Sequence, residues 1–250
     1  MSVQTKVFNL ARPQLNHPSS LEITRGILPT LKISFVNGPV YIGEKLSSLI
    51  VINSNASEPT AIGIAVDLTL PSQQVVSLLH TEATNRILEP KSHCEELVQY
   101  EPKEAGNYSM LVSVYYKSNH DSSGESQVTH SVPVRQTCYF TAAPCVNVKT
   151  KVSTTKAQQL AVETQIENIS KNLLGLETIQ FLPNSGWESK ILKNTTAQLL
   201  PGDIYQSCFI LDRTDEKALG HGGPLGRLTL SWRREMGEKG WLTTGLVSGI

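Results

Sequence analysis

Apolar and polar residues alternate along much of this chain, as expected for extended strands with one buried and one solvated face. In one run, Ile62, Ile64, Val66 and Leu68 are apolar and the residues between them are small or polar. The same alternation recurs over 108–116, 146–152 and 228–232. Helix signals are weak, and only 77–87 and 214–219 suit a turn or two. The pattern therefore predicts an all-β fold.

The strand pattern occurs twice in the same order. Each copy has a strand ending in Asn, an apolar strand, a Leu-x-Pro stop, another apolar run and a Gly-led strand. The first copy comprises 46–53, 62–70, 88–90, 97–100 and 106–116. The second comprises 160–168, 173–182, 199–201, 205–211 and 226–232. A duplicated all-β unit of about 100 residues predicts two tandem immunoglobulin-like β-sandwich domains, which usually act as interaction modules.

Local breaks in the pattern set the expected boundaries. The stretch Ala142-Ala143-Pro144 separates a closing strand from an opening one and leaves almost no linker. We therefore expect an extended N-terminal arm at 1–27, a first immunoglobulin-like sandwich at 28–143 and a second at 144–250. In the second copy the apolar phase slips between Leu176 and Ile179, which predicts a β-bulge there.

Charge and hydropathy restrict the partners. The chain has 22 Lys and Arg and 22 Asp and Glu among 250 residues, and the two signs are interleaved. No basic stripe is present to neutralise a phosphate backbone, so nucleic acid is excluded as a partner. The first residues lack the apolar core of a secretory signal, and no run approaches the length of a membrane span. We expect a soluble, cytoplasmic protein.

Cysteines and sequons leave a second interpretation open. Reduced thiols are expected for all four cysteines in cytosol, although Cys145 and Cys208, with Trp187 between them, approach the disulfide pattern of extracellular immunoglobulin domains. Four glycosylation sequons begin at Asn55, Asn107, Asn168 and Asn194. The alternative is therefore a secreted or cell-surface adhesion or binding module.

Candidate chemistry is absent from the sequence patterns. The stretch 38–45 resembles a phosphate-binding loop, but Glu44 stands where the required Lys would be. A glycine-rich stretch at 220–223 has no Gly-x-Ser-x-Gly nucleophile elbow to serve. His93 and Cys94 are adjacent on a strand and cannot face one metal ion. We predict no enzyme activity, no catalytic or metal-binding residues and no cofactor.

Exposed aromatic and charged residues are the candidates for protein contacts. Trp232 is in phase with Leu228 and Leu230 and is predicted to lie in the core, whereas Trp187 and Trp241 follow turn residues. Aromatic side chains in loops can anchor interfaces, or can simply cap the end of a sandwich. Sandwiches bind through sheet edges and end loops. The predicted interaction residues are Glu101, Glu104, Trp187, Arg233, Arg234, Glu238 and Trp241.

Short segments spread along most of the chain carry a family resemblance. They include KVFNLARP at 6–13, VYIGEKLSS at 40–48, YEPKEAG at 100–106, VNVKTK at 146–151 and GEKGWL at 237–242. No single segment is specific, but their order is. Together they resemble subunit 13 of the trafficking protein particle (TRAPP) complex, and the chain is identified as a member of that family.

The resemblance implies a function that the residues alone do not. It implies a non-catalytic adaptor subunit of a complex that acts as guanine-nucleotide exchange factor for a Rab GTPase in ER-to-Golgi transport and autophagy. The partners would be other TRAPP subunits, with the Rab GTPase and the membrane reached only through the complex. The location would be cytoplasmic, peripheral to ER–Golgi and Golgi membranes. The family's usual further C-terminal domain is absent here, so we expect a fragment, a short isoform or a divergent member.

Overall fold

The computed structural model is all-β, as predicted. It describes residues 3–9, 40–55, 57, 59–82, 86–116, 133–155, 159–192, 196–214, 223–234 and 239–249, and these contain strands but no helix. The helical expectation for 77–87 is wrong where it is described, because strand β5 (Val75–Thr81) pairs with a neighbour. The expectation for 214–219 lies largely outside the described residues.

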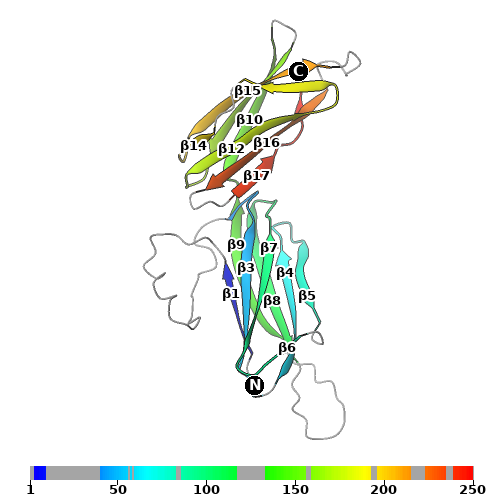
Figure 1. Ribbon diagram of the computed structural model, residues 1–250, viewed down its shortest axis with the longest axis vertical. Helices are drawn as coiled ribbons and strands as arrows, with labels where there is room; N and C mark the ends of the chain where they lie inside the picture. Colours follow the sequence, from blue (N-terminus) through cyan, green and yellow to red (C-terminus); the bar gives the residue numbers. More distant parts are fainter. Residues whose placement is uncertain are drawn as a thin grey trace. The chain divides into compact units, whose positions relative to one another are not determined.

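The first compact unit comprises Met1–Val40 and Lys45–Ala143. Its smaller antiparallel sheet has the order β1-β3-β7, formed by Val3–Asn9, Leu46–Ser54 and His93–Tyr100 (Figure 1). Its larger sheet has the order β2-β9-β8-β4-β5, with β6 beside β4. The bounds of its further strands are β2 Val40–Tyr41, β4 Thr60–Thr69, β6 Ile87–Leu88, β8 Gly106–Tyr116 and β9 Val134–Ala143. Residues Val3–Asn9, expected to begin an extended arm, are extended and pair along β3.

The second compact unit comprises Tyr41–Glu44 and Pro144–Ile250. One sheet has the order β10-β11-β15-β13, formed by Val146–Thr154, Leu160–Asn168, Ile204–Arg213 and Trp187–Ile191. The other has the order β14-β12-β16-β17, with β18 also on β16. Its strands are β12 Leu174–Pro183, β14 Ala197–Leu199, β16 Pro224–Arg234, β17 Lys239–Thr243 and β18 Val247–Ser248.

Alternation along the strands produces a core in each unit, because every second side chain points to the same face. In the first unit, Ile62, Ile64 and Val66 on β4 are fully buried, and Tyr108 on β8 stacks on Phe140 with ring centroids 4.9 Å apart. The predicted burial of Trp232 in the second unit is confirmed, since none of its surface is exposed. The predicted bulge is confirmed too, by a register shift between Leu176 and Thr178.

A four-residue segment from the amino-terminal half completes the second unit. The N–H of Trp241 on β17 donates to the carbonyl of Gly43 at 3.2 Å, and Glu44 forms an antiparallel bridge with Gly240. Gly43 has φ +87°, and a Cβ at Gly43 or Gly240 would overlap the Trp241 backbone or the Trp232 ring, respectively. These close contacts require glycine at both positions. The sequence pattern gave no sign of this arrangement.

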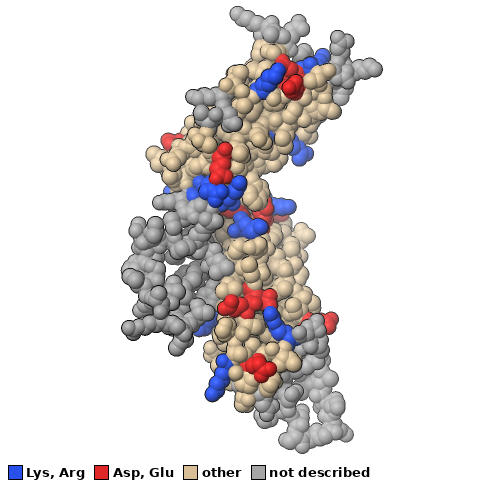
Figure 2. All heavy atoms as spheres, viewed as in Figure 1, with Lys and Arg blue, Asp and Glu red and all other residues tan. Residues whose placement is uncertain are grey.

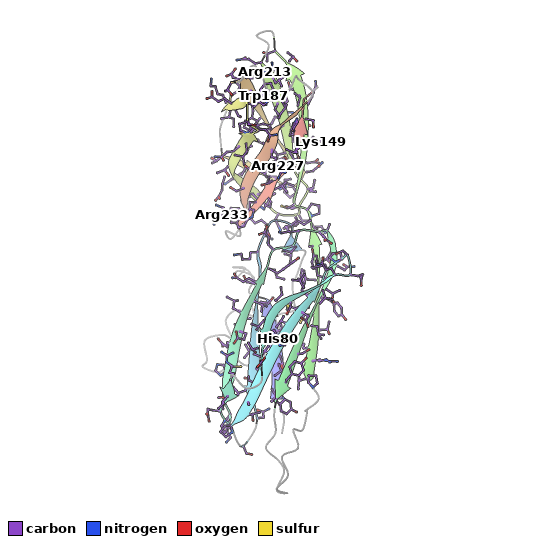
Figure 3. The ribbon with its side chains drawn as sticks, turned by 90° about the vertical axis from the view of Figure 1, so that its right-hand side faces the viewer. His80, Lys149, Trp187, Arg213, Arg227 and Arg233 are labelled. Carbon is purple, nitrogen blue, oxygen red and sulfur yellow. The ribbon has the colours of Figure 1, made fainter. Side chains whose placement is uncertain are left out.

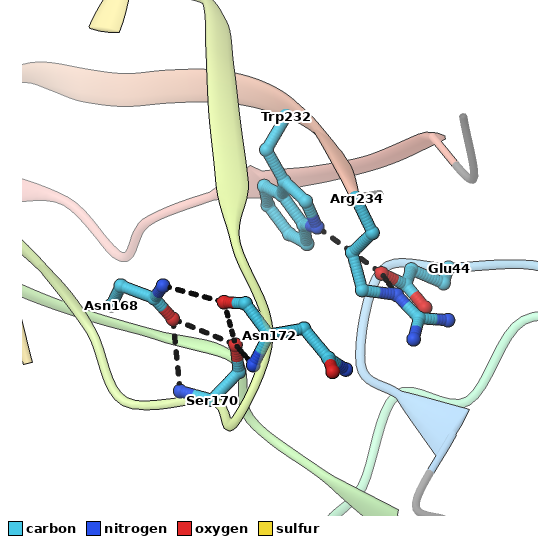
Figure 4. A network of polar contacts seen from close by, with 6 residues as sticks. All are labelled: Glu44, Asn168, Ser170, Asn172, Trp232 and Arg234. Atoms are coloured by element: carbon cyan, nitrogen blue, oxygen red, sulfur yellow. Dashed lines mark hydrogen bonds and ion pairs between the residues drawn. The ribbon is translucent and has the colours of Figure 1, made fainter. Parts of the chain in front are cut away.

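The same segment contributes a buried ion pair. The Glu44 side chain is 4% exposed and accepts hydrogen bonds at Oε1 from Arg234 Nε at 2.7 Å and from Trp232 Nε1 at 3.3 Å (Figure 4). The Arg234 guanidinium also lies over the Tyr41 ring, 4.9 Å from its centroid. A carboxylate removed from water is stable only when it is paired and hydrogen-bonded. Glu44 is thus a structural residue of the second unit.

Candidate interaction surface

An exposed tryptophan lies on the outer face of the sheet β14-β12-β16-β17. Trp241 is 44% exposed, and its strand neighbour Gly240 faces the core. In register with it are Ser231 on β16 and then Thr178 on β12, whose hydroxyl oxygens are 2.7 Å apart. The indole is therefore presented beside short polar side chains that satisfy one another.

Paired charges border the tryptophan. Glu177 is the extra residue of the bulge in β12. Its carboxylate accepts a hydrogen bond from Arg233 Nε at 2.6 Å and lies 3.3 Å from Lys239 Nζ. The hydrogen bond from Arg233 lowers the pKa of Glu177 below its usual value. With two cations and one anion, this group has a net charge of +1. We call the set Glu177, Thr178, Ser231, Arg233, Lys239 and Trp241 the Trp241 face.

Among the predicted interaction residues that the structure describes, Arg233 and Trp241 lie together on the Trp241 face. Trp241 was expected in a turn but lies within β17. Glu177 and Lys239 were missed by sequence reasoning, although the phase slip that predicted the bulge also marks Glu177 as a residue with an unusual orientation. Charged groups appear in small mixed clusters on the side of the molecule that Figure 2 shows.

Trp187 lies near the other end of the same unit from Arg233 (Figure 3). It was expected in a loop, but it begins β13, where it pairs with Arg213. The Arg213 guanidinium is 5.5 Å from the Trp187 ring centroid, a cation–π distance. Trp187 and Trp241 therefore do not form one surface patch.

Arg234 points to the opposite face from Arg233, as successive residues of a strand do. Its side chain is 17% exposed and is engaged by Glu44. Its position indicates a role in packing the second unit. Glu238, the neighbouring prediction, lies outside the described residues.

Glu101 and Glu104 follow β7 in the first unit. The backbone of Glu104 is fixed by Tyr108, whose hydroxyl donates to the Glu104 carbonyl at 2.8 Å and accepts from its N–H at 3.3 Å. Burial raises the pKa of the Tyr108 hydroxyl. The Glu104 carboxylate is exposed and accepts from Ser72 Oγ at 3.5 Å. This loop presents a fixed backbone with an acidic side chain.

Metal sites, membrane spans and disulfides are the remaining candidate features of the chain. Within the residues that the structure describes, no group of three or more His, Cys, Asp and Glu side chains is placed to hold a metal ion. The same part of the chain contains no helix long and apolar enough to cross a membrane. All four cysteines are free thiols, Cys145 and Cys208 included.

The asparagine of one sequon, Asn168, is buried and hydrogen-bonded inside the fold. Asn168 is fully buried, and its amide donates to the carbonyls of Asn172 at 2.8 Å and Leu199 at 2.9 Å. Its oxygen accepts from the N–H and hydroxyl of Ser170 at 3.0 and 2.7 Å (Figure 4). All the bonding capacity of this side chain is used, so the folded chain has no acceptor for a glycan at Asn168.

These features define an all-β protein with several sheets, in which the described candidate site is an exposed surface of aromatic and paired charged groups. The family model for trafficking protein particle complex subunit 13, N-terminal, matches residues 26–132, and the model for the middle domain of the same subunit matches 146–248. The chain belongs to the trafficking protein particle complex subunit 13 family.

Similar proteins from several animals carry the same family name. A probable subunit 13 homolog from Caenorhabditis elegans is 29% identical in an alignment of 225 positions that covers 84% of this chain and 53% of that protein. Subunit 13 of Xenopus laevis is 25% identical in an alignment of 239 positions that covers 88% of this chain and 55% of that protein. The chain thus spans about half the length of these relatives. Among solved structures, Salmonella alpha-2-macroglobulin covers 84% of this chain, and 16% of its own, at 9% identity and a TM-score of 0.46, too low to support an argument.

Proposed function

We propose that this chain is a non-catalytic adaptor subunit of the TRAPP complex. The supporting observation is that both of its units match subunit 13 models in order along the chain. In this proposal the complex exchanges guanine nucleotide on a Rab GTPase during ER-to-Golgi transport and autophagy. The chain supplies contacts to other TRAPP subunits and reaches the GTPase and the Golgi membrane only through them.

The proposal includes the fold of each unit. Two antiparallel sheets with apolar inner faces suit an immunoglobulin-like β-sandwich, with one sandwich before Pro144 and one after it. Such modules display their edges, end loops and outer sheet faces to partners. An adaptor role needs no more chemistry than this.

The first experiment is co-purification. A tagged chain expressed in cells of its own organism is expected to recover other TRAPP subunits under gentle conditions, with an unrelated tagged β-sandwich protein as the control. Recovery of none of them would contradict the assignment. The isolated chain is expected not to accelerate nucleotide exchange on the Rab GTPase, whereas the purified complex does. Exchange by the chain alone would overturn its non-catalytic role.

We assign the Trp241 face as a contact surface for another subunit. Exposed Trp and Arg side chains are enriched among residues that dominate binding energy. Trp241→Ala is expected to weaken recovery of the contacted subunit by at least about tenfold, which corresponds to about 1.4 kcal/mol. Leu246→Ala is the matched control, since Leu246 is a large apolar residue of the same unit and is 52% exposed. Equal recovery with both variants would remove this assignment.

The predicted loops give a second test of the contact surface. Charge reversal at Glu101 and Glu104 in the loop after β7, or at Arg233 on β16, is expected to reduce assembly if that region faces a partner. The Arg233 variant also breaks the pair with Glu177, so Glu177→Gln is needed beside it. Loss with Arg233→Glu but not with Glu177→Gln assigns the effect to the surface. Unchanged assembly with every variant argues against both regions as contact surfaces.

A further inference from the structure

One edge strand of the first unit lacks the charged residues that protect sheet edges. Strand β5, Val75–Thr81, has the sequence VVSLLHT and pairs with β4 on one side. No described strand pairs with its other side. Edge strands present unpaired backbone groups, and natural proteins usually protect them with Lys, Glu or Pro. Strand β5 has none of these.

The other described edge strands differ from β5 in carrying charged side chains. Each edge strand longer than three residues, other than β5, carries at least one charged side chain. These are Lys6 on β1, Glu95 and Glu96 on β7, Lys149 and Lys151 on β10, Glu188 and Lys190 on β13, and Lys239 on β17. Strand β17 is covered in addition by Gly43 and Glu44. Against this background the bare edge of β5 is an exception within one molecule.

The register shows which backbone groups the edge offers. The N–H of Leu70 donates to the carbonyl of Gln74 at 2.8 Å, so Gln74 directs its backbone groups toward β4. Successive residues of an antiparallel strand direct their backbone groups to opposite sides. Val75 and Ser77 therefore point their N–H and C=O groups away from β4. A segment laid beside β5 can bond with both residues.

The side chains along this edge are apolar and partly exposed. Val75 is 60% exposed, and Val76, Leu78 and Leu79 are half-buried. Strand β5 itself contains no Lys, Arg, Asp or Glu. A charged residue stands on the neighbouring strand β4, where Asp67 lies opposite Ser77 and faces the outer surface. A partner segment that covers these side chains removes apolar surface from water.

A bulge in β5 bears on what can occupy the edge. The register with β4 shifts between Val66 and Asp67, so Leu78 is the extra residue of β5. Bulges bend and twist an edge, which opposes flat pairing of two identical strands. A second copy of this chain presents the same bulge and is a poor match. A different segment, free to follow the twist, is a better one.

From these observations we propose that β5 receives an extended segment of another TRAPP subunit, which adds to the larger sheet as a further strand. The inference rests on the proposed function. The segment is uncharged at the residues that face Val75 to Leu79, because a charge placed against this edge would be dehydrated without a counter-charge. Backbone hydrogen bonds supply the affinity, and the apolar side chains of β5 select the segment.

Co-purification with matched variants tests the inference. Ser77→Lys places a cation at an exposed edge position, and Thr137→Lys places one at an exposed position on β9 of the same sheet. We expect Ser77→Lys to reduce recovery of the bound subunit by about tenfold. We expect Thr137→Lys to leave it unchanged. Circular dichroism of each variant checks that the sheets still form.

Hydrogen exchange gives a readout specific to strand addition. In the wild-type assembly, the amides of Val75 and Ser77 are expected to exchange at least about tenfold more slowly than in the free chain. If TRAPP subunits are recovered but these amides stay unprotected, or Ser77→Lys binds like wild type, the strand-addition inference is overturned and the proposed function stands. If wild type recovers no subunit, both fail. Dimers of the free chain that Ser77→Lys dissociates would overturn it in favour of a second copy as the occupant.

Discussion

The two units build the same turn with different residues. In the first, the N–H of Ser92 donates to the carbonyl of Glu89 across Pro90 and Lys91; in the second, the N–H of Asp203 donates to Leu200 across its own proline. The residue after proline has φ +57° in the first turn and +87° in the second, as in a type II turn. Both turns then bind the end of a neighbouring strand. The Leu-x-Pro repeat in the sequence is thus a repeated backbone structure.

The strand ends held by these turns differ in chemistry. The carbonyl of Ser92 accepts from the N–H of Ser54, and the carbonyl of Asp203 accepts from the N–H of Asn168, each at 2.9 Å. Hydrogen bonding therefore makes Ser54 the counterpart of Asn168, whereas the sequence repeat had aligned Asn53 with it. In the second unit the side chain of Asn168 binds the carbonyls of Leu199 and Asn172 and both polar groups of Ser170 at once. A repeat conserves backbone geometry more readily than the side chain that anchors it.

The largest expected effect comes from removing that anchor. Asn168→Ala leaves the carbonyls of Leu199 and Asn172 and the hydroxyl of Ser170 without their buried partner, which costs about 3–5 kcal/mol of unfolding free energy. Asn53→Ala, at a half-exposed position, is expected to cost about 0.5 kcal/mol or less. All three tryptophans lie in the second unit, so tryptophan fluorescence in guanidinium reports on that unit. Equal guanidinium midpoints for the two variants would show that the two strand ends contribute equally to stability.

The next effect tests the segment that the second unit takes from the amino-terminal half. Glu44→Ala removes the carboxylate that pairs with Arg234 in a largely buried site and is expected to cost about 2–3 kcal/mol, less than for a fully buried pair. Lys45→Ala, one residue further on and exposed, is the control. The tryptophan-detected transition should shift for the first variant only. A shift of equal size for both would mean that the ion pair contributes nothing.

The turns themselves provide a smaller effect. Gly202→Ala adds a Cβ that meets no atom within 4 Å, so its cost is conformational and is expected to be about 1 kcal/mol. Lys91→Gly in the first unit relieves the strain of a positive φ but increases the conformational entropy of the unfolded chain. The net change in unfolding free energy should therefore be within about 0.5 kcal/mol. Thermal unfolding of each variant measures both. A larger loss for the Lys91 variant would indicate that its side chain stabilises the turn.

The cysteines compare the interiors of the units with little effect on stability. Each unit has one buried thiol, Cys138 or Cys145, and one that is half-buried, Cys94 or Cys208. Burial raises the pKa of Cys138 to about 11 and that of Cys145 to about 12. Because the thiolate reacts, alkylation of the buried pair at neutral pH should be at least about a hundredfold slower than for an unperturbed thiol. Mass analysis of labelled peptides checks the order, and early labelling of Cys145 would show that the second unit opens locally.

Much of the strand layout followed from alternation, because burial of one sheet face imposes a period of two on the sequence. The predicted strand over 106–116 coincides with β8, and the phase slip near Leu176 marked a real bulge. The pattern failed at β5, where Leu78 and Leu79 are adjacent apolar residues and suggested a helix. An edge strand is buried on neither face completely, so its period is weak, and the bulge breaks it further.

The candidate surface was predicted less well, for a different reason. Whether a charged residue is exposed depends on its partner, and Arg233 and Arg234 are indistinguishable until the strand register separates them. Glu44 shows the same limit, because its partner Arg234 is 190 residues away in the chain. Trp241 was selected correctly as exposed, but its strand and its charged neighbours came from pairing that local patterns do not encode.

The position of Tyr41–Glu44 has a consequence for how the protein is made. These residues leave the ribosome long before the strands they complete, so the second unit cannot reach its final packing until the last of its strands has been synthesised. Until then Glu44 has no Arg234 to bind. A shortened transcript or a proteolytic cut that separates 41–44 from 144–250 would leave a carboxy-terminal piece with an uncovered β17 and an incompletely enclosed Trp232.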